Sequence, residues 1–269
     1  MSATMFGVRG RTAQLAWYRT DEAAAEVAFL HGFSDSAQCW EPLIGAMPGI
    51  RALAIDARGH GESGLPEEPI GYASQCDDAA LVLSSQPGDG GVVVVGHSMG
   101  AMSAAYLAAS RPDLVRAVVL EDPPTGEPSA APQDESEPVP VPTWLSDLRA
   151  LDLPARIERG RSDESDWPDD EFEPWAVSKA QLNPHLFELP YQEPAPLTDL
   201  LAAITCPVLL IHGDTDRGSL ISTEYAKRCA EAAAGEFQAI HIAGAGHSVR
   251  RDNRPQYLAE LTTFLNRHR

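Results

Sequence analysis

Short apolar runs and amphipathic segments alternate along most of the chain. Runs rich in β-branched and other apolar residues predict strands over residues 13–19, 27–30, 51–55, 92–95, 116–120, 207–211 and 237–242. Residues 2–20 together predict an opening pair of strands. Apolar positions near a 3.6-residue spacing predict helices over residues 38–47, 72–85, 101–110, 223–234 and 255–266. Strands that alternate with helices predict an α/β fold with a mostly parallel sheet, covered by helices on both faces.

This pattern breaks after residue 122. The stretch from there to residue 143 is rich in Pro, Ser and acidic residues and predicts no core of its own. Helical patterns return over residues 144–151 and about 170–182, before the sheet pattern resumes. We therefore expect a core domain of residues 1–122 and 196–269, with residues 123–195 inserted between two strands.

Charge narrows the range of partners. The net charge of the chain is −19, and Asp and Glu outnumber Lys and Arg by 18 to 5 between Glu121 and Pro196. An acidic stretch of this kind is typical of a solvated surface. Because binding to phosphates needs clustered Lys and Arg, we expect neither a nucleic acid nor an anionic membrane as a partner.

The cysteines and the N-terminus indicate the compartment. The cysteines are scattered and form no CxxC pair: Cys39, Cys76, Cys206 and Cys229. Free thiols are typical of a reducing compartment. No basic-then-apolar leader and no apolar stretch of membrane-spanning length occur in the sequence. We expect a soluble, cytoplasmic protein.

A serine motif lies at the centre of the pattern. Val92–Val95 predicts a strand buried on both faces, Gly96-His97-Ser98-Met99-Gly100 follows, and a helix comes next. A sharp turn from strand to helix holds a serine hydroxyl in the open, where the helix N-terminus favours developing negative charge. The two glycines are expected because a Cβ at either position would strike a neighbouring element.

Five motifs occur in an order and spacing typical of one family. They are His31-Gly32-Phe33, Asp56-Ala57-Arg58-Gly59-His60-Gly61, Gly96-His97-Ser98-Met99-Gly100, His212-Gly213-Asp214-Thr215-Asp216 and Gly244-Ala245-Gly246-His247. On these motifs the chain resembles the α/β-hydrolase family over almost its whole length. The resemblance implies an eight-stranded sheet and a helical cap formed by residues 123–195.

The motifs supply the groups that acyl transfer needs. A serine hydroxyl needs an adjacent base, and His247 is the candidate base for Ser98. The backbone N–H groups of Phe33 and Met99 are the candidate oxyanion donors. His31, His60 and His97 also lie in the motifs, and we interpret these three rings as structural supports for the loops.

The acid that orients His247 has two candidates. Most of the family places it three residues after Gly213, at Asp216, but the segment 217–222 that follows is about two residues longer than the family pattern. Asp122 lies at the end of the sixth predicted strand, where some haloalkane dehalogenases and zearalenone-type lactonases of this fold carry the acid. We slightly favour Asp122 and keep Asp216 as the alternative. Glu121 points to the opposite face of the strand.

The substrate is expected to be small to medium in size and largely apolar. This follows from the resemblance, because sites under a cap in this family are aromatic. The candidate lining residues are Phe33, Trp40, Met102, Trp144, Trp167 and Trp175. The alternative is that the tryptophans of the insertion form its own small core. The acidic insertion disfavours an anionic substrate.

The predicted function is hydrolysis of a carboxylic ester or a lactone by a serine nucleophile. Ser98 in place of an aspartate argues against dehalogenase and epoxide hydrolase chemistry. Two alternatives stay open, namely a carbon–carbon bond hydrolase or perhydrolase with the same residues, and a non-catalytic small-molecule receptor. No cofactor is expected, since the sequence has no GxGxxG after its first strand, no Walker pattern and no metal-ligand spacing.

Overall fold

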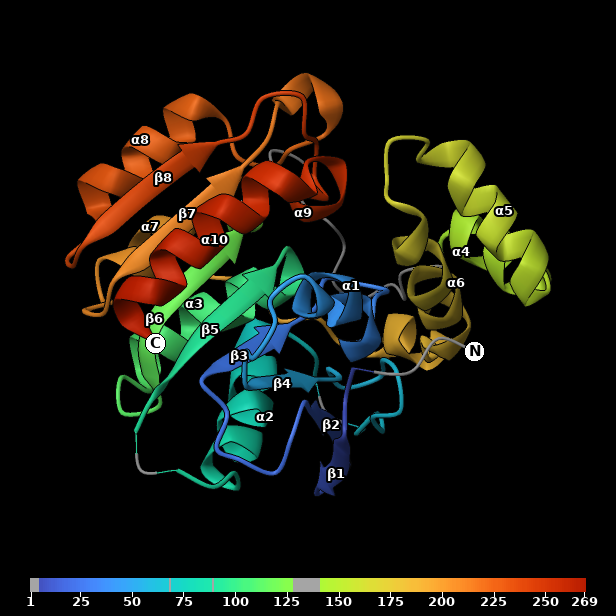
Figure 1. Cartoon of the computed structure of the whole chain (residues 1–269), viewed down its shortest axis with the longest axis horizontal. Coiled ribbons are helices and arrows are strands. Elements are labelled where there is room, and N and C mark those ends of the chain that lie inside the picture. The colour runs from blue at the N-terminus through green and yellow to red at the C-terminus, as the bar shows by residue number, and fades with distance from the viewer. Residues whose placement is uncertain (1–4, 68, 89, 128–140) are drawn as a thin grey trace.

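In the computed structural model, eight strands form one sheet (Figure 1). The structure describes residues 5–67, 69–88, 90–127 and 141–269. The strands are β1 (Val8–Thr12), β2 (Leu15–Arg19), β3 (Val27–Leu30), β4 (Ala52–Ile55), β5 (Val92–His97), β6 (Val115–Glu121), β7 (Val208–His212) and β8 (Phe237–His241). Their order is β1-β2-β4-β3-β5-β6-β7-β8. β2 is antiparallel to β1 and to β4. The remaining pairs are parallel, so that β4, β3, β5, β6, β7 and β8 run in the same direction.

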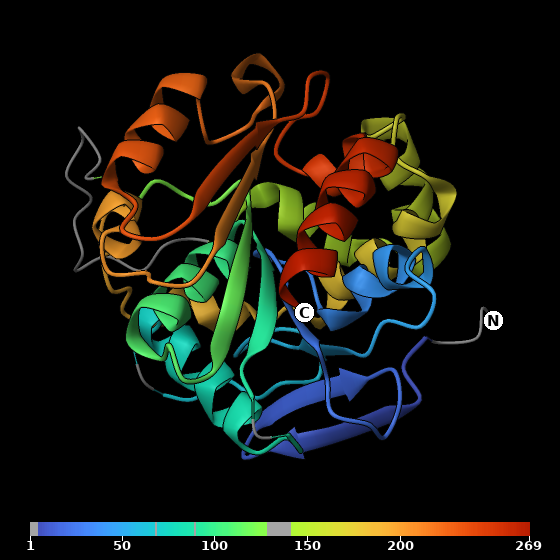
Figure 2. The same ribbon diagram turned by 60° about the vertical axis from the view of Figure 1, so that its left-hand side comes forward.

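Helices cover both faces of this sheet. One face packs against α2 (Tyr72–Ser84), α3 (Met99–Ser110), α7 (Leu197–Leu201) and α8 (Thr223–Ala232). The other packs against a 3₁₀ helix (Ala37–Trp40), α1 (Glu41–Gly45), α9 (Val249–Asp252) and α10 (Arg254–His268). Figure 2 shows α10 (red) and α1 (blue) across the sheet from the orange and teal helices. The predicted α/β class is confirmed, because strands buried on both faces need a helical layer on each side.

The predicted elements agree with the observed ones to within about two residues, with a few instructive exceptions. The helix predicted over 38–47 divides into the 3₁₀ helix and α1. Pro42 lies in the first turn of α1, and a proline has no N–H to continue the hydrogen bonding of the preceding turn. The sequence pattern also missed α5 (Leu153–Asp163). Its signal was the start Asp152-Leu153-Pro154, in which the Asp152 side chain accepts from the Ala155 amide at 2.9 Å.

The inserted helices lie between β6 and β7 in the chain and apart from the layered core in space (Figure 1). They comprise α4 (Thr143–Ala150), α5, a 3₁₀ turn (Asp169–Glu171), α6 (Phe172–Gln181) and a 3₁₀ helix (Pro184–Glu188). Residues 128–140 of the predicted insertion lie outside the described residues. The helix that follows, α7, packs against α3 and α8 and so belongs to the core. That the insertion forms a cap remains a proposal.

Two further features concern the hydrophobicity of the helices and the state of the cysteines. Among the helices of the described residues, none combines the length and the apolar character needed to cross a bilayer. Each of the four cysteines is a free thiol, and Cys39, Cys76 and Cys229 are buried.

Candidate active site

Ser98 occupies the turn between β5 and α3 in a strained backbone conformation. Its φ and ψ are 51° and −115°, in a region that L residues rarely adopt. The glycines of the motif make the turn possible. A Cβ on Gly96 would strike the backbone of Gly100, and a Cβ on Gly100 would strike the backbone of Leu30. The sequence therefore places the hydroxyl at the N-terminal end of α3, as the motif predicts.

Three side chains form a continuous chain of hydrogen bonds. The Ser98 Oγ lies 2.9 Å from His247 Nε2, and His247 Nδ1 lies 2.6 Å from Asp122 Oδ2. Since a carboxylate only accepts, Nδ1 carries the proton and Nε2 is free to accept from the serine. The structure thus brings together Ser98, His247 and Asp122 from three separate segments, with the geometry of a nucleophile, a base and an orienting acid.

The loop after β7 holds the carboxylate of Asp122. The Ser219 hydroxyl donates to its Oδ1 at 2.6 Å, and the amides of Leu220 and Ile221 donate at 2.9 and 3.3 Å. The Asp122 side chain is fully buried. These donors belong to the segment 217–222, whose extra length departs from the family pattern. The longer segment therefore contains all three of these donors to the acid.

Asp216, the alternative acid, does not reach His247. It lies in an exposed 3₁₀ turn, Thr215–Arg217, and within the described residues it makes no hydrogen bond to His247. Its neighbour Asp214 accepts from His241 Nε2 at 2.6 Å and from the Gly244 amide at 2.7 Å. The difference between the two acids has a physical reason, since the loop after β7 folds toward Asp122 and leaves Asp216 facing solvent.

Two backbone amides are free to face a carbonyl oxygen bound at Ser98. Gly32 lies against the site, because a Cβ on it would strike His97 and lie 3.4 Å from the Ser98 Cβ. In the described part of the chain, the amides of Phe33 and Met99 donate no hydrogen bond. Met99 is also the first residue of α3, where the helix dipole favours negative charge. These amides are therefore placed as candidate oxyanion donors.

The other histidines of the motifs support the backbone around the site. His31 donates from Nδ1 to the Gly32 carbonyl at 2.8 Å and accepts at Nε2 from the Ala57 amide at 3.0 Å. His97 donates from Nε2 to the His247 carbonyl at 3.0 Å. Burial lowers the pKa of the His31 and His97 rings and lowers that of His60 to about 3. Neutral rings of this kind fix loops and carry no charge into the site.

A buried ionic network lies beside the candidate oxyanion loop, and no local sequence pattern predicts it. Asp35 accepts from Lys179 Nζ at 2.9 Å and from Arg251 Nη2 at 2.9 Å, with Arg250 Nη2 at 3.3 Å. Burial alone would raise the pKa of Asp35, but these cations hold it well below its usual range. Lys179 also donates to the carbonyl and the hydroxyl of Ser34. Helix α6 of the insertion is thereby tied to the loop that carries Phe33.

The same network reaches the end of β6. Glu121 is fully buried and accepts from the Arg250 amide at 2.8 Å, with the Arg250 guanidinium at 3.3 Å. Glu171 of the insertion accepts from Arg251 at 3.0 Å and from Arg254 at 2.6 Å. Glu121 and Asp122 therefore point to opposite faces, as the strand alternation predicts. Asp122 accepts a hydrogen bond from His247, and Glu121 accepts one from the Arg250 amide in α9, the helix that follows His247.

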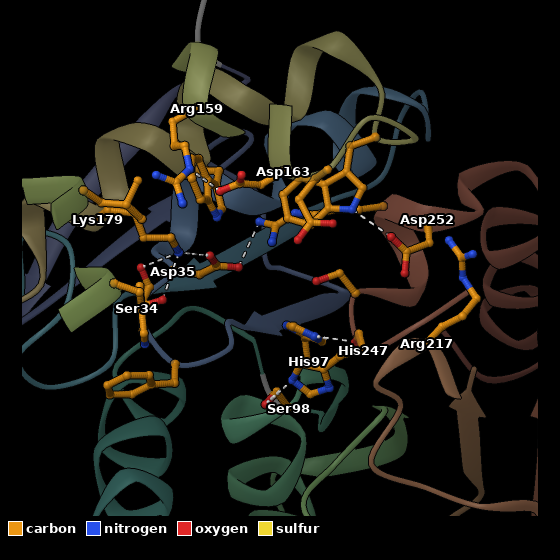
Figure 3. Close-up of a pocket in the computed structure, with 18 of the residues that line it drawn as sticks. Ser34, Asp35, His97, Ser98, Arg159, Asp163, Lys179, Arg217, His247 and Asp252 are labelled. Atoms are coloured by element: carbon orange, nitrogen blue, oxygen red, sulfur yellow. Dashed lines mark hydrogen bonds and ion pairs between the residues drawn. The ribbon is translucent and has the colours of Figure 1, made fainter. Parts of the chain in front are cut away.

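Two cavities open at Ser98. The larger, about 640 Å³, is lined by His247, by Phe33 and by three tryptophans of the insertion, Trp144, Trp167 and Trp175. Charged side chains also surround it, and Figure 3 shows Arg159, Asp163 and Lys179 across the space from Ser98 and His247. The smaller cavity, about 260 Å³, is lined by Phe33, Met99 and apolar side chains. The larger cavity is thus more polar than the sequence pattern predicts.

Two predicted lining residues lie in the core instead. Trp40 is fully buried, with its ring 5.1 Å from that of Phe29 and the Arg250 guanidinium 4.3 Å above it. Met102 is fully buried on the opposite face of the sheet. Both lie close in sequence to the site, but their helical positions turn them into the core. Trp167 serves both predicted purposes, since it lines the larger cavity and also stacks on Phe172 at 6.0 Å.

The fold and this arrangement of serine, histidine and aspartate define a class of hydrolase. Residues 27–261 match the model of the alpha/beta hydrolase family. Because this match covers most of the chain, the protein belongs to that family.

The chain is also similar to individual proteins whose names state an activity. Over 254 residues the chain is 28% identical to a 2-(acetamidomethylene)succinate hydrolase of Mesorhizobium japonicum, covering 88% of this chain and 87% of the relative. Over 99 residues it is 42% identical to lipase LipV of Mycobacterium tuberculosis, a match that spans only 37% of each chain. The crystal structure of an E-2-(acetamidomethylene)succinate hydrolase superposes with a TM-score of 0.73 at 21% identity, covering 96% of this chain and 99% of that one.

Proposed function

We propose that the protein is a serine hydrolase that cleaves a carboxylic ester or a lactone through an acyl-enzyme. The observation that carries this proposal is the hydrogen-bond chain from the Ser98 hydroxyl through His247 to the buried carboxylate of Asp122. A hydroxyl that donates to a neutral imidazole is activated as a nucleophile. The amides of Phe33 and Met99 donate no hydrogen bond within the described residues, and they can therefore stabilise the negative charge that develops on the carbonyl oxygen.

The proposed first half-reaction forms the acyl-enzyme. The Ser98 oxygen bonds to the carbonyl carbon as its proton passes to His247 Nε2, and the carbonyl oxygen takes the negative charge. The amides of Phe33 and Met99 stabilise that oxyanion, and Asp122 stabilises the imidazolium. The bond to the alkoxy oxygen then breaks, and the leaving oxygen takes the proton from His247. A lactone follows the same course, with its alkoxy group still attached to the acyl chain.

The second half-reaction consumes water. A water molecule gives its proton to His247 Nε2 as its oxygen bonds to the acyl carbon. Collapse of the second tetrahedral intermediate breaks the bond to Ser98, which takes the proton back from His247. The products are a carboxylic acid and an alcohol from an ester, or a single hydroxy acid from a lactone, and the enzyme returns to its starting state.

The relatives are compatible with this chemistry. One relative is named a lipase and another a hydrolase of an acetamidomethylene succinate. We infer for this chain a substrate of small to medium size, since the smaller cavity is apolar and holds about 260 Å³. The tryptophans of the insertion add apolar walls to the larger cavity.

An assay with p-nitrophenyl esters of increasing acyl length tests the proposal. The wild-type protein should release p-nitrophenol with turnover, and Ser98→Ala should reduce kcat by several orders of magnitude. Equal release by the two proteins would overturn the assignment of Ser98. Binding of esters without turnover would instead favour a receptor. Turnover of carbon–carbon or peroxide substrates alone would favour the other enzymatic alternative.

A further inference from the structure

Ser98 lies where two cavities of different character meet. Phe33 and Ser98 line both of them. His247 lines only the larger cavity, and Met99 lines only the smaller one. The site is therefore divided into a side that contains the base and a side that contains one candidate oxyanion donor.

The smaller cavity has a built apolar wall. Its lining includes Ile70, Tyr72, Leu186, Phe187, Leu189 and Tyr191. The wall is fixed by backbone hydrogen bonds, since the Ile70 amide donates to the Pro190 carbonyl at 2.8 Å and the Gln192 amide donates to the Ile70 carbonyl at 2.8 Å. The Phe187 ring meets the Phe33 ring edge to face at 5.7 Å. The segment around residue 70 and the segment after the 3₁₀ helix at 184–188 thus enclose a stable apolar space.

We propose that the smaller cavity binds the acyl chain of the substrate and that the larger cavity binds the leaving group. This assignment rests on the proposed function. The leaving oxygen must receive its proton from His247 Nε2, so the leaving group has to lie on the side that His247 lines. The carbonyl oxygen faces the amides of Phe33 and Met99, which leaves the acyl chain on the side of Met99.

The charges of the larger cavity limit the leaving group to a neutral or cationic alcohol. Each cation that lines it has an anionic partner among the described residues. These pairs are Arg159 with Asp163, Arg217 with Asp166, Lys179 with Asp35, and Arg251 with both Asp35 and Glu171.

The carboxylates of the larger cavity outnumber these cations. Among the described residues, the lining carboxylates Asp147 and Glu164 have neither an ion pair nor a hydrogen bond. Burial and the nearby charges of Asp252 and Asp163 raise the pKa of Glu164, while the charges of Arg251 and Arg217 lower it. Among the described residues that line the cavity, a negatively charged alcohol would find no unpaired cation and would face these carboxylates.

A crossed kinetic experiment tests the division of the site. One series varies the acyl chain from acetate to dodecanoate on a constant p-nitrophenyl leaving group. In the wild type, kcat/KM should rise by about fourfold for each added methylene until the small cavity is full, and then fall. Leu189→Trp, which narrows the smaller cavity, should reduce kcat/KM for octanoate at least tenfold more than for acetate. Phe187→Ala, which widens it, should move the optimum to a longer chain.

The second series keeps the butyryl group constant and varies the leaving group, using thiols in place of alcohols. Thiocholine and neutral thioglycerol esters should be cleaved at least tenfold faster than an ester of a thiol that carries a carboxylate, and added salt should reduce the difference. Trp144→Ala should change this second series and leave the acyl-length optimum where it was. Leu81→Trp, an exposed substitution on α2 outside both cavities, controls for the effect of adding an indole.

The outcomes separate this inference from the function on which it rests. If Trp144→Ala shifts the acyl optimum and Leu189→Trp changes only alcohol preference, the assignment of the cavities is reversed and our proposal is wrong. A preference for the anionic thiol would overturn the inferred charge of the leaving group. If no ester is turned over and a fluorophosphonate does not label Ser98, the proposed function fails and this inference fails with it.

Discussion

The ends of β6 and β7 carry acidic residues that look alike in the sequence and behave differently in the structure. At the end of β6, Asp122 is fully buried, accepts three hydrogen bonds from the loop after β7 and reaches His247 at 2.6 Å. At the end of β7, Asp216 is exposed and Asp214 is tied to His241 and Gly244. The β6 end supplies the candidate acid, and the β7 end supplies the loop that holds it.

This difference shows how a departure from a family pattern changes the role of a loop. The donors to Asp122, Ser219, Leu220 and Ile221, all lie within the segment 217–222. A buried carboxylate needs such donors, because an unpaired charge in the interior is costly. The position of the acid and the length of the neighbouring loop are therefore one structural feature rather than two.

The largest expected effect separates the two strand ends directly. Asp122→Asn should lower kcat by on the order of 10⁴, because an amide donates to His247 Nδ1 and forces the tautomer that cannot accept from Ser98. Asp216→Asn should change kcat by less than about twofold, since its carboxylate is exposed and, within the described residues, makes no hydrogen bond to His247. Steady-state kinetics on one p-nitrophenyl ester measures both. Equal losses in the two variants would break the comparison.

A second prediction distinguishes the two acidic neighbours on β6. Glu121→Gln weakens the ion pair with the buried Arg250 and should lower the free energy of unfolding by about 3–5 kcal/mol. Its kcat should fall far less than that of Asp122→Asn, because Glu121 faces away from His247. Urea unfolding followed by tryptophan fluorescence gives the stability, and the ester assay gives kcat. A loss of kcat as large as that of Asp122→Asn, in a stable variant, would contradict this division.

The third prediction concerns the loop after β7. Ser219→Ala removes the 2.6 Å hydrogen bond to Asp122 and should lower the free energy of unfolding by about 1.5–3 kcal/mol, with a smaller loss of kcat than in Asp122→Asn. Ser222→Ala is the matched control in the same loop. It removes the cap of α8 and should cost about 1 kcal/mol of stability with no change in kcat. Equal kcat in the two serine variants would show that the loop does not support the acid.

The smallest expected effect lies at the end of β7. The Gly244 amide and the His241 side chain lower the pKa of Asp214. An acid whose pKa is lower in the folded state stabilises the fold above its unfolded pKa and loses that contribution as the pH falls through the folded value. Asp214→Asn should therefore lower Tm slightly at neutral pH, and the difference from wild type should shrink below about pH 3.8. A Tm difference that grows on acidification would contradict this role.

Much of the fold could be predicted from the sequence, because its signals are local. Buried strands such as Val92–Val95 and the glycines around Ser98 carry their structural reasons within a few residues. Helix α5 is mostly polar, so it lacks the apolar spacing that predicts a helix, and the cap at Asp152 is its main local signal.

The site was only partly predictable, because its decisive contacts are long-range. Asp122 and Asp216 both follow parallel strands, β6 and β7. The choice between them depends on Ser219, which lies 97 residues after Asp122. The contact of Lys179 with Asp35 joins residues 144 positions apart. The aromatic side chain of Trp40 predicts a place in the cavity wall. Its burial against Arg250 depends on packing that no local pattern reveals.

The central claim is that Ser98 is activated by a histidine that Asp122 holds in place. The most direct measurement is the rate at which a fluorophosphonate labels the protein, with peptide mass spectrometry to locate the label in wild type, Asp122→Asn and Asp216→Asn. We expect the label on Ser98, at similar rates in wild type and Asp216→Asn and at a rate lower by orders of magnitude in Asp122→Asn. Labelling of another residue, or equal rates in all three proteins, would contradict the claim.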